Sequence, residues 1–176
     1  MSESATIILS NGKTCLIDKC DVDLITLKSE KYPYQKNPQI IWREKKWNDK
    51  LSYAITMVRI CADKWQMIRM HRLIMGITDP RIQVDHRDND GLNNRRYNLR
   101  VASVHQNSMN TRPRKGTSKF KGVCFQKNKW RATIMHNYKS IGLGSFDSEF
   151  EAALAYDKKA KELFGEFARL NNPASI

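Results

Sequence analysis

Asp85 and His86 are adjacent residues at the start of a loop rich in side chains that bind metals or move protons. The stretch from 84 to 100 reads V-D-H-R-D-N-D-G-L-N-N-R-R-Y-N-L-R. Imidazole titrates near neutral pH and can take a proton from an attacking water, whereas carboxylate oxygens suit hard divalent cations. Turn formation explains each Asn, Asp or Gly taken singly. The Asp-His pair within an oxygen-rich loop instead predicts a reaction centre.

Two short strands and a helix are expected to position these groups. We expect strands over 82–86 and 99–102, and a helix that starts after Ser103 and runs to about 110. A strand-strand-helix unit brings the end of its first strand opposite the first turns of its helix. Asn107 would then lie across from the Asp-His pair.

The expected roles follow from the chemistry of each group. Asp85 and Asn107 would supply oxygen ligands to one Mg²⁺ or Mn²⁺ ion, which keeps waters and accepts a phosphate oxygen. His86 would act as general base, and Asn98 would orient its ring through a side-chain or backbone hydrogen bond. Such a constellation is a one-metal phosphodiester hydrolase.

Two other histidines are candidates for assistance. His105 is an alternative ligand, but a step of two residues on a helix turns a side chain by about 200°, so His105 and Asn107 cannot both face Asp85. Asn107 is the preferred ligand. For His71, in M-H-R-L-I, a packing or hydrogen-bonding role is preferred over catalysis.

Four motifs in order carry a resemblance: V-D-H at 84–86, N-N-R at 94–96, N-L-R at 98–100 and Q-N at 106–107. Over about residues 68–110 the chain resembles the HNH family of phage and intron-encoded homing endonucleases. The resemblance implies a phage or intron-borne source and the host cytoplasm as location. It also implies the following roles: His86 as base, Asp85 and Asn107 as metal ligands, and Asn98 as orienting residue.

A second resemblance lies in residues 118–172, with S-K-F-K-G-V, K-W-R-A, L-G-S-F-D and A-R-L-N in order. These motifs resemble the plant ethylene-response-factor domain, also called the APETALA-two domain. The resemblance implies a three-stranded antiparallel sheet that enters the major groove of DNA, with one helix behind it. Strand alternation predicts the same faces, with Trp130, Ala132 and Ile134 toward the helix. The plant target sequence is not carried over, because Cys124 and Gln126 stand where plant members place Arg or Trp.

Charge points to duplex DNA as the partner. The chain of 176 residues has 31 Lys and Arg against 18 Asp and Glu, which gives a net charge of +13, and between 101 and 140 no carboxylate occurs. Arg reads guanine edges, Gln reads adenine and Lys holds phosphate. The expected DNA contacts are Arg112, Arg114, Lys115, Lys119, Lys121, Gln126, Lys127, Lys129, Arg131, Thr133, Met135 and Lys139.

The fold class expected is α+β. A β-rich region, opened by a hairpin at Asn11-Gly12, and a ββα-metal HNH unit would form a domain over 1–110. A basic linker over 111–117 would lead to the sheet-and-helix domain over 118–172. Residues 31–50 are expected to be an irregular basic segment. The four scattered cysteines predict no zinc site, and no apolar run predicts a membrane span or an export signal.

These observations predict a site-specific DNA endonuclease that needs a divalent metal and no small-molecule cofactor. One site per chain without an obvious dimer helix predicts a monomer that nicks one strand, whereas a dimer would cut both. Two alternatives stay open: a non-catalytic DNA-binding regulator with a relic HNH unit, and an RNA-directed or structure-specific nuclease. The presence of all four site residues argues against the relic, and a sheet for the major groove suits B-form DNA better than A-form RNA.

Overall fold

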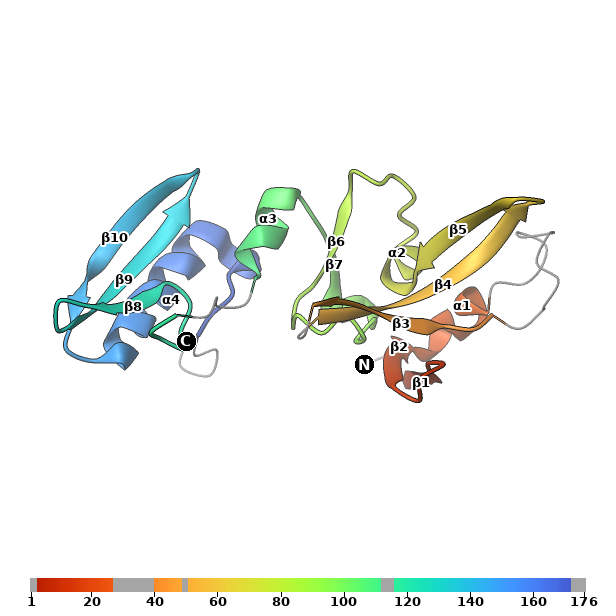
Figure 1. Cartoon of the computed structure of the whole chain (residues 1–176), viewed down its shortest axis with the longest axis horizontal. Coiled ribbons are helices and arrows are strands. Elements are labelled where there is room, and N and C mark those ends of the chain that lie inside the picture. Colours follow the sequence, from red (N-terminus) through yellow and green to blue (C-terminus); the bar gives the residue numbers. More distant parts are fainter. Residues whose placement is uncertain (1–2, 27–39, 49–50, 112–115, 172–176) are drawn as a thin grey trace. The chain divides into compact units, whose positions relative to one another are not determined.

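The computed structural model describes residues 3–26, 40–48, 51–111 and 116–171. The chain divides into two compact units, 1–103 and 104–176 (Figure 1). Each unit has its own hydrophobic core and is described separately.

The first unit opens with the antiparallel hairpin of β1 (Ser4–Ile8) and β2 (Thr14–Asp18), as the Asn-Gly pair predicts. Gly12 takes a φ of 81°, which a glycine adopts readily in a hairpin turn. A short 3-10 turn, η1 (Lys19–Asp21), and the helix α1 (Val22–Ile25) follow.

A three-stranded antiparallel sheet, in the order β3-β4-β5, forms the body of the first unit. Its strands are β3 (Arg43–Asn48), β4 (Leu51–Cys61) and β5 (Lys64–Arg69). Along β4, buried residues alternate with half-buried ones, so one face of the sheet packs on the core. The helix α2 (Met70–Ile74) continues directly from β5, and its Met70 and Ile74 enter that core.

The motif-bearing loop lies between β6 (Gln83–His86) and β7 (Leu99–Ala102), which pair antiparallel. The 3-10 turn η3 (Arg96–Asn98) leads into β7. Backbone hydrogen bonds join both sides of Leu16 on β2 to this loop, because Leu16 N–H donates to the Leu92 carbonyl and Asn94 N–H donates to the Leu16 carbonyl. Arg96 is anchored as well, since its guanidinium binds the carboxylate of buried Asp21. The hairpin and α1 region therefore hold the loop in place.

The second unit begins with α3 (Val104–Met109) and then forms an antiparallel sheet in the order β10-β9-β8. The strands are β8 (Val123–Gln126), β9 (Lys129–His136) and β10 (Lys139–Phe146). The helix α4 (Glu149–Phe164) packs on one face, and η4 (Gly165–Phe167) follows it (Figure 1). Ser148 caps α4 by accepting the Phe150 N–H, as a helix N-cap does.

A buried polar network explains one of the second unit's sequence motifs, A-R-L-N. The fully buried Asp157 of α4 accepts the backbone N–H of Asn171. The Asn171 side chain in turn accepts from the Lys121 N–H and donates to the Lys121 carbonyl. The Asn of A-R-L-N thus has a structural role, because it ties residue 171 to α4 and to the segment before β8.

Two expected features of the chain's organisation are not observed. The segment 31–50 was expected to be irregular, but 43–48 forms β3, so that prediction is wrong there; residues 31–39 and 49–50 lie outside the described residues. The mixed fold with a three-stranded sheet on a helix is observed. The grouping of β6, β7 and α3 into one ββα-metal unit is not, because α3 belongs to the second compact unit. The expected domain boundaries stay predictions.

No helix among the described residues is long and apolar enough to cross a membrane.

Candidate active site and nucleic-acid interface

Asp85 and His86 lie at the end of β6 and are both buried. In the strand register Asp85 stands opposite Arg100, and the two side chains form an ion pair. The guanidinium donates through Nε at 2.9 Å and Nη2 at 2.7 Å to one oxygen, Oδ2, of the carboxylate. A buried carboxylate requires such a partner, since an unpaired charge in the interior is costly.

The His86 ring is held by Asn94. Nε2 of His86 lies 3.1 Å from Oδ1 of Asn94, which is fully buried. The amide nitrogen of Asn94 is oriented independently, because it donates to Sγ of Cys15 at 2.9 Å and points to the Gly91 carbonyl. Oδ1 must therefore accept, and Nε2 of His86 must carry the proton. Nδ1 is then the basic nitrogen of the ring.

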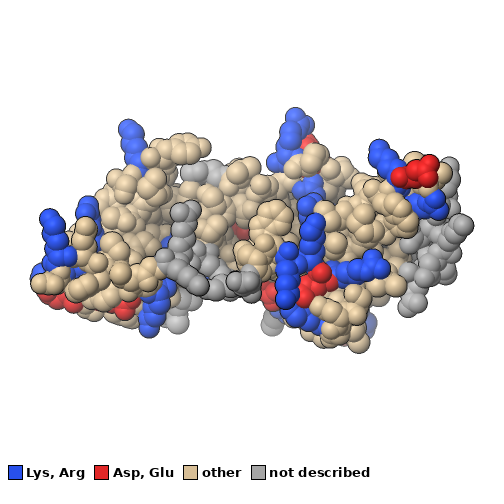
Figure 2. Space-filling model, in the orientation of Figure 1, with Lys and Arg blue, Asp and Glu red and all other residues tan. Residues whose placement is uncertain are grey.

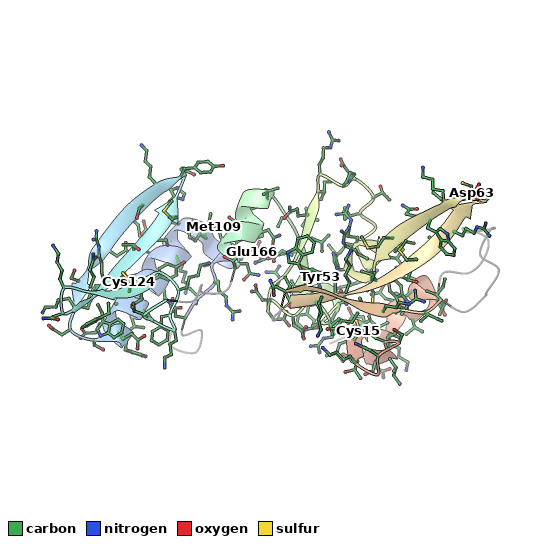
Figure 3. The ribbon with its side chains drawn as sticks, in the orientation of Figure 1. Cys15, Tyr53, Asp63, Met109, Cys124 and Glu166 are labelled. Carbon is green, nitrogen blue, oxygen red and sulfur yellow. The ribbon has the colours of Figure 1, made fainter. Side chains whose placement is uncertain are left out.

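Burial also sets the protonation state of these groups. It lowers the pKa of His86 below the ordinary imidazole value, against the opposing effect of the Asn94 hydrogen bond and of nearby Asp88 and Asp85. The imidazole is accordingly neutral at pH 7, as a general base must be. Burial raises the pKa of Cys15 to about 11, so this residue is a neutral thiol (Figure 3 labels it on β2).

Asn98 braces the loop. Its side-chain carbonyl accepts the Asp88 N–H, and its side-chain amide donates to the Asp88 carboxylate and the Asn93 carbonyl. Its backbone carbonyl accepts the Arg87 N–H. These contacts close the loop from both ends. The direct orienting role expected for Asn98 stays a prediction, and Asn94 is the residue whose contact with His86 the structure describes.

The rings of Tyr53, His71 and His86 pack together. The His71 ring lies edge-on to His86 with centroids 5.1 Å apart, and Tyr53 lies 5.2 Å from His71 and 5.7 Å from His86 (Figure 3 labels Tyr53). Nδ1 of the buried His71 has no hydrogen-bond partner among the described residues. Burial lowers the pKa of His71 well below its usual range, and the nearby charges of Arg69 and Arg72 lower it further. His71 is therefore a neutral ring that packs against Tyr53 and His86. The expectation that it does not take part in catalysis stays a prediction.

Gly91 allows the loop to approach the sheet. A Cβ on Gly91 would lie 2.1 Å from the Ser52 carbonyl oxygen and 2.7 Å from the Tyr53 ring. The loop thus packs against the start of β4 only because residue 91 has no side chain. Asn89, with a φ of 60°, makes the turn itself.

The second expected metal ligand, Asn107, does not belong to the same compact unit as Asp85. Asn107 is a half-buried residue of α3 in the second unit, and the His105 side chain is outside the described residues. Among the described residues no three His, Cys, Asp or Glu side chains form a group able to hold a metal ion. The metal site therefore stays a prediction. The donor types, a carboxylate and an amide oxygen, fit a hard cation, which would have to share Asp85 with Arg100.

In the second unit, the sheet face that points away from α4 carries several predicted DNA contacts. Ala132 and Ile134 are buried against α4, whereas Arg131 and Met135 are exposed and Thr133 is half-buried. Gln126, Lys127, Lys129, Arg131 and Ser145 line a polar recess of about 190 Å³. Lys119 and Lys139 are exposed too. Figure 2 shows Lys and Arg side chains standing out from both units.

Two of these lysines have partners within the unit. Lys121 turns inward and donates to the Met109 carbonyl at 2.6 Å, and burial lowers its pKa to about 8. Lys129 pairs with Asp147. Arg112, Arg114 and Lys115 lie outside the described residues.

Parts of this chain are similar in sequence to known proteins. Protein 3.8 of Escherichia phage T7 is 36% identical over 89 residues, which make up 49% of this chain and 73% of the phage protein. The chain belongs to the family of phage T7 protein 3.8.

Two further relatives correspond to the two resemblances. A protein of Acanthamoeba polyphaga mimivirus named as an uncharacterized HNH endonuclease is 36% identical over 110 residues, covering 59% of this chain. Dehydration-responsive element-binding protein 2C of Arabidopsis thaliana is 42% identical over 64 residues, covering 35% of this chain. The chain spans 57% of the mimivirus protein and 19% of the plant protein. Both resemblances read from the motifs are confirmed. No family model and no solved structure matches the chain.

Proposed function

We propose that this protein is an HNH-type endonuclease that hydrolyses one phosphodiester of duplex DNA at a preferred site. The observation that carries the proposal is the buried His86 ring, fixed by Asn94 in a defined tautomer next to Asp85. The relationship to a protein named as an HNH endonuclease supports it.

The base in this reaction is Nδ1 of His86. Because Nε2 carries the proton donated to Asn94, Nδ1 has the lone pair that takes a proton from an attacking water. The rings of Tyr53 and His71 restrict the orientation of the imidazole. A fixed ring loses no rotational freedom when the reaction begins.

Asp85 and Asn107 would hold one Mg²⁺ or Mn²⁺ ion. When bound, such an ion supplies positive charge for the phosphate and the leaving oxygen. Arg100, paired with Asp85, holds that carboxylate in place at the end of β6. The other ligands would be water and substrate oxygens.

The second unit would position the reaction on a duplex. The face of its sheet that points away from α4 would enter the major groove, where Arg131 and Gln126 read base edges and the lysines hold phosphates. The relative named for binding a dehydration-responsive element supports DNA as partner. We propose further that the chain acts as a monomer in the host cytoplasm and nicks one strand.

A nicking assay tests the catalytic assignment. Supercoiled phage DNA is incubated with the full chain and Mg²⁺ or Mn²⁺, in parallel with His86→Ala and with an EDTA control. We expect open circles only from the unmodified protein with metal, while His86→Ala still retards DNA on a gel. Equal nicking by both proteins would show that His86 is not the base.

A non-catalytic DNA-binding regulator is the second candidate. The buried ion pair that engages Asp85 favours it, because a carboxylate already neutralised by Arg100 binds a cation less readily. Binding of the unmodified protein to DNA without nicking, under every metal tested, would select this candidate.

A further inference from the structure

Apart from Tyr53, one face of the β3-β4-β5 sheet has no role in the function proposed above. On β4, Ala54, Thr56 and Val58 are buried in the core, so Tyr53, Ile55, Met57 and Arg59 occupy the opposite side. We call this side the outer face. Strand register assigns the neighbouring side chains to it, since Tyr53 stands opposite Lys45, Ile55 opposite Arg43 and Arg69, Met57 opposite Met67, and Arg59 opposite Trp65.

The charges of the outer face all have one sign. Its nine residues include Arg43, Lys45, Arg59 and Arg69, and none of the nine is Asp or Glu. Within the described part of the chain no ion pair joins Arg43, Lys45 or Arg69 to a carboxylate. The Lys45 ammonium instead lies 3.8 Å from the Met67 sulfur, across the intervening strand. A surface used only for solvation normally mixes both signs.

Flat apolar groups lie among these cations. Trp65 is 56% exposed, and its neighbour Arg59 is held at the β4-β5 turn by donating to the Ala62 carbonyl. From the row of Tyr53 to the row of Arg59 the face extends over six residues, or roughly 20 Å. It is three strands wide, about 10 Å, which is close to the width of the B-form major groove.

The outer face ends at the reaction centre. Tyr53, at one end of it, contacts the rings of His71 and His86. Arg69 at the same end contributes to the positive field around His71. A polyanion lying along this face would therefore extend to the His86 ring.

We propose that the outer face of β3-β4-β5 is a second DNA-docking surface, on which Arg43, Lys45 and Arg69 hold the phosphates of the duplex next to His86. Only the placement next to His86 rests on the proposed nuclease function; the binding itself does not. Charge complementarity commits the surface to a nucleic acid, and a flat sheet face suits the accessible groove of B-form DNA better than the deep, narrow major groove of duplex RNA.

The salt dependence of DNA binding tests this surface. The full chain is titrated onto a labelled duplex of about 30 base pairs of arbitrary sequence, in EDTA so that no cleavage intervenes, at several salt concentrations. Each phosphate contact contributes about 0.9 to the slope of log K against log salt. The variant Arg43→Gln/Lys45→Gln/Arg69→Gln should lower the magnitude of the slope by about 2 to 3 and weaken binding at least tenfold near 0.1 M salt.

A matched triple variant controls for net charge. Lys13→Gln/Lys19→Gln/Arg81→Gln removes the same three charges from cations that are already paired with carboxylates. It should leave the slope within about 1 of the original value. Equal slopes for the two triple variants would overturn the proposal.

Thermal unfolding, a variant that retains charge and a titration with duplex RNA complete the test. Thermal unfolding verifies that each variant is folded, and Arg43→Lys/Arg69→Lys, which retains both charges, should keep most of the affinity. Duplex RNA in the same titration identifies the partner, because a loss of RNA binding without a loss of DNA binding also overturns the proposal. If His86→Ala nicks normally, the nuclease assignment falls while the docking surface is still judged by the slopes alone.

Discussion

Nε2 of His86 donates a hydrogen bond of 3.1 Å to Oδ1 of Asn94, and this single contact determines which ring nitrogen can act as a base. The contact is rigid because the Asn94 amide is anchored at its other end by Cys15 on β2. The N-terminal hairpin thus reaches His86 through two buried side chains, Cys15 and Asn94.

Loss of this contact should slow the reaction without weakening DNA binding. Asn94→Ala leaves the His86 N–H unpaired and the ring free to change tautomer, and outer contacts of this kind are worth about 10- to 100-fold in activity. We expect nicking to slow by that factor and the first unit to lose about 1–3 kcal/mol of stability. Single-turnover nicking and gel retardation measure the two effects.

A charge-changing variant distinguishes orientation from simple packing. Asn94→Asp places a carboxylate against the ring, which favours imidazolium and raises the pKa of His86. The acid limb of the pH-rate profile should therefore move to higher pH. A role limited to packing would leave that limb where it is.

The ion pair of Asp85 with Arg100 predicts a large and non-additive stability effect. Arg100→Met strands a buried carboxylate, for which the expected loss is about 3–5 kcal/mol in denaturant unfolding. Adding Asp85→Asn removes the stranded charge, so the double variant should be more stable than Arg100→Met alone. Strict additivity of the two single losses would contradict a direct pair.

The sequence predicted elements whose signals are local. The hairpin followed from Asn-Gly, and the position of Asp85 and His86 at a strand end followed from the residue pattern over 82–86. β3 was missed because R-E-K-K-W-N has no alternation of apolar residues, and its pairing with β4 supplies the stability instead. Local pattern cannot report such pairing.

The Asn94 contact was missed for a related reason. Its anchor, Cys15, is 79 residues away in the sequence, so nothing near N-N-R identifies which Asn meets the imidazole. The one signal in the sequence for an Asn with a further role was that two Asn residues, Asn93 and Asn94, are adjacent in the loop. The grouping of α3 with β6 and β7 came from an expected strand-strand-helix unit, whereas compactness assigns the helix to the second unit.

A substitution at Gly91 tests whether the loop must approach β4 closely. Gly91→Ala places a methyl group 2.1 Å from the Ser52 carbonyl oxygen, so the loop must move away from β4 and from Tyr53. We expect a loss of more than 1 kcal/mol in stability, as for overpacked sites, and a clear loss of nicking. Gly142→Ala is the matched control, because the nearest atom to its added methyl group would be the Arg131 guanidinium at 4.0 Å. Similar behaviour of the two variants would show that the Gly91 approach is not required.

The last prediction concerns stability against pH. The folded-state pKa of His71 lies well below the unfolded value, so below about pH 6.5 the unfolded chain takes up a proton that the folded chain does not. The stability is therefore fully present above that pH and declines as pH falls toward the folded pKa, by at most about 1.4 kcal/mol per unit for one proton. His71→Phe keeps an aromatic ring and removes the proton site, so denaturant unfolding between pH 7 and 5 should show a flatter decline for the variant. The buried His86 contributes in the same direction, which leaves part of the decline in place. Identical pH profiles for the two proteins would mean that His71 is protonated in the folded state, against its burial and its unpartnered Nδ1.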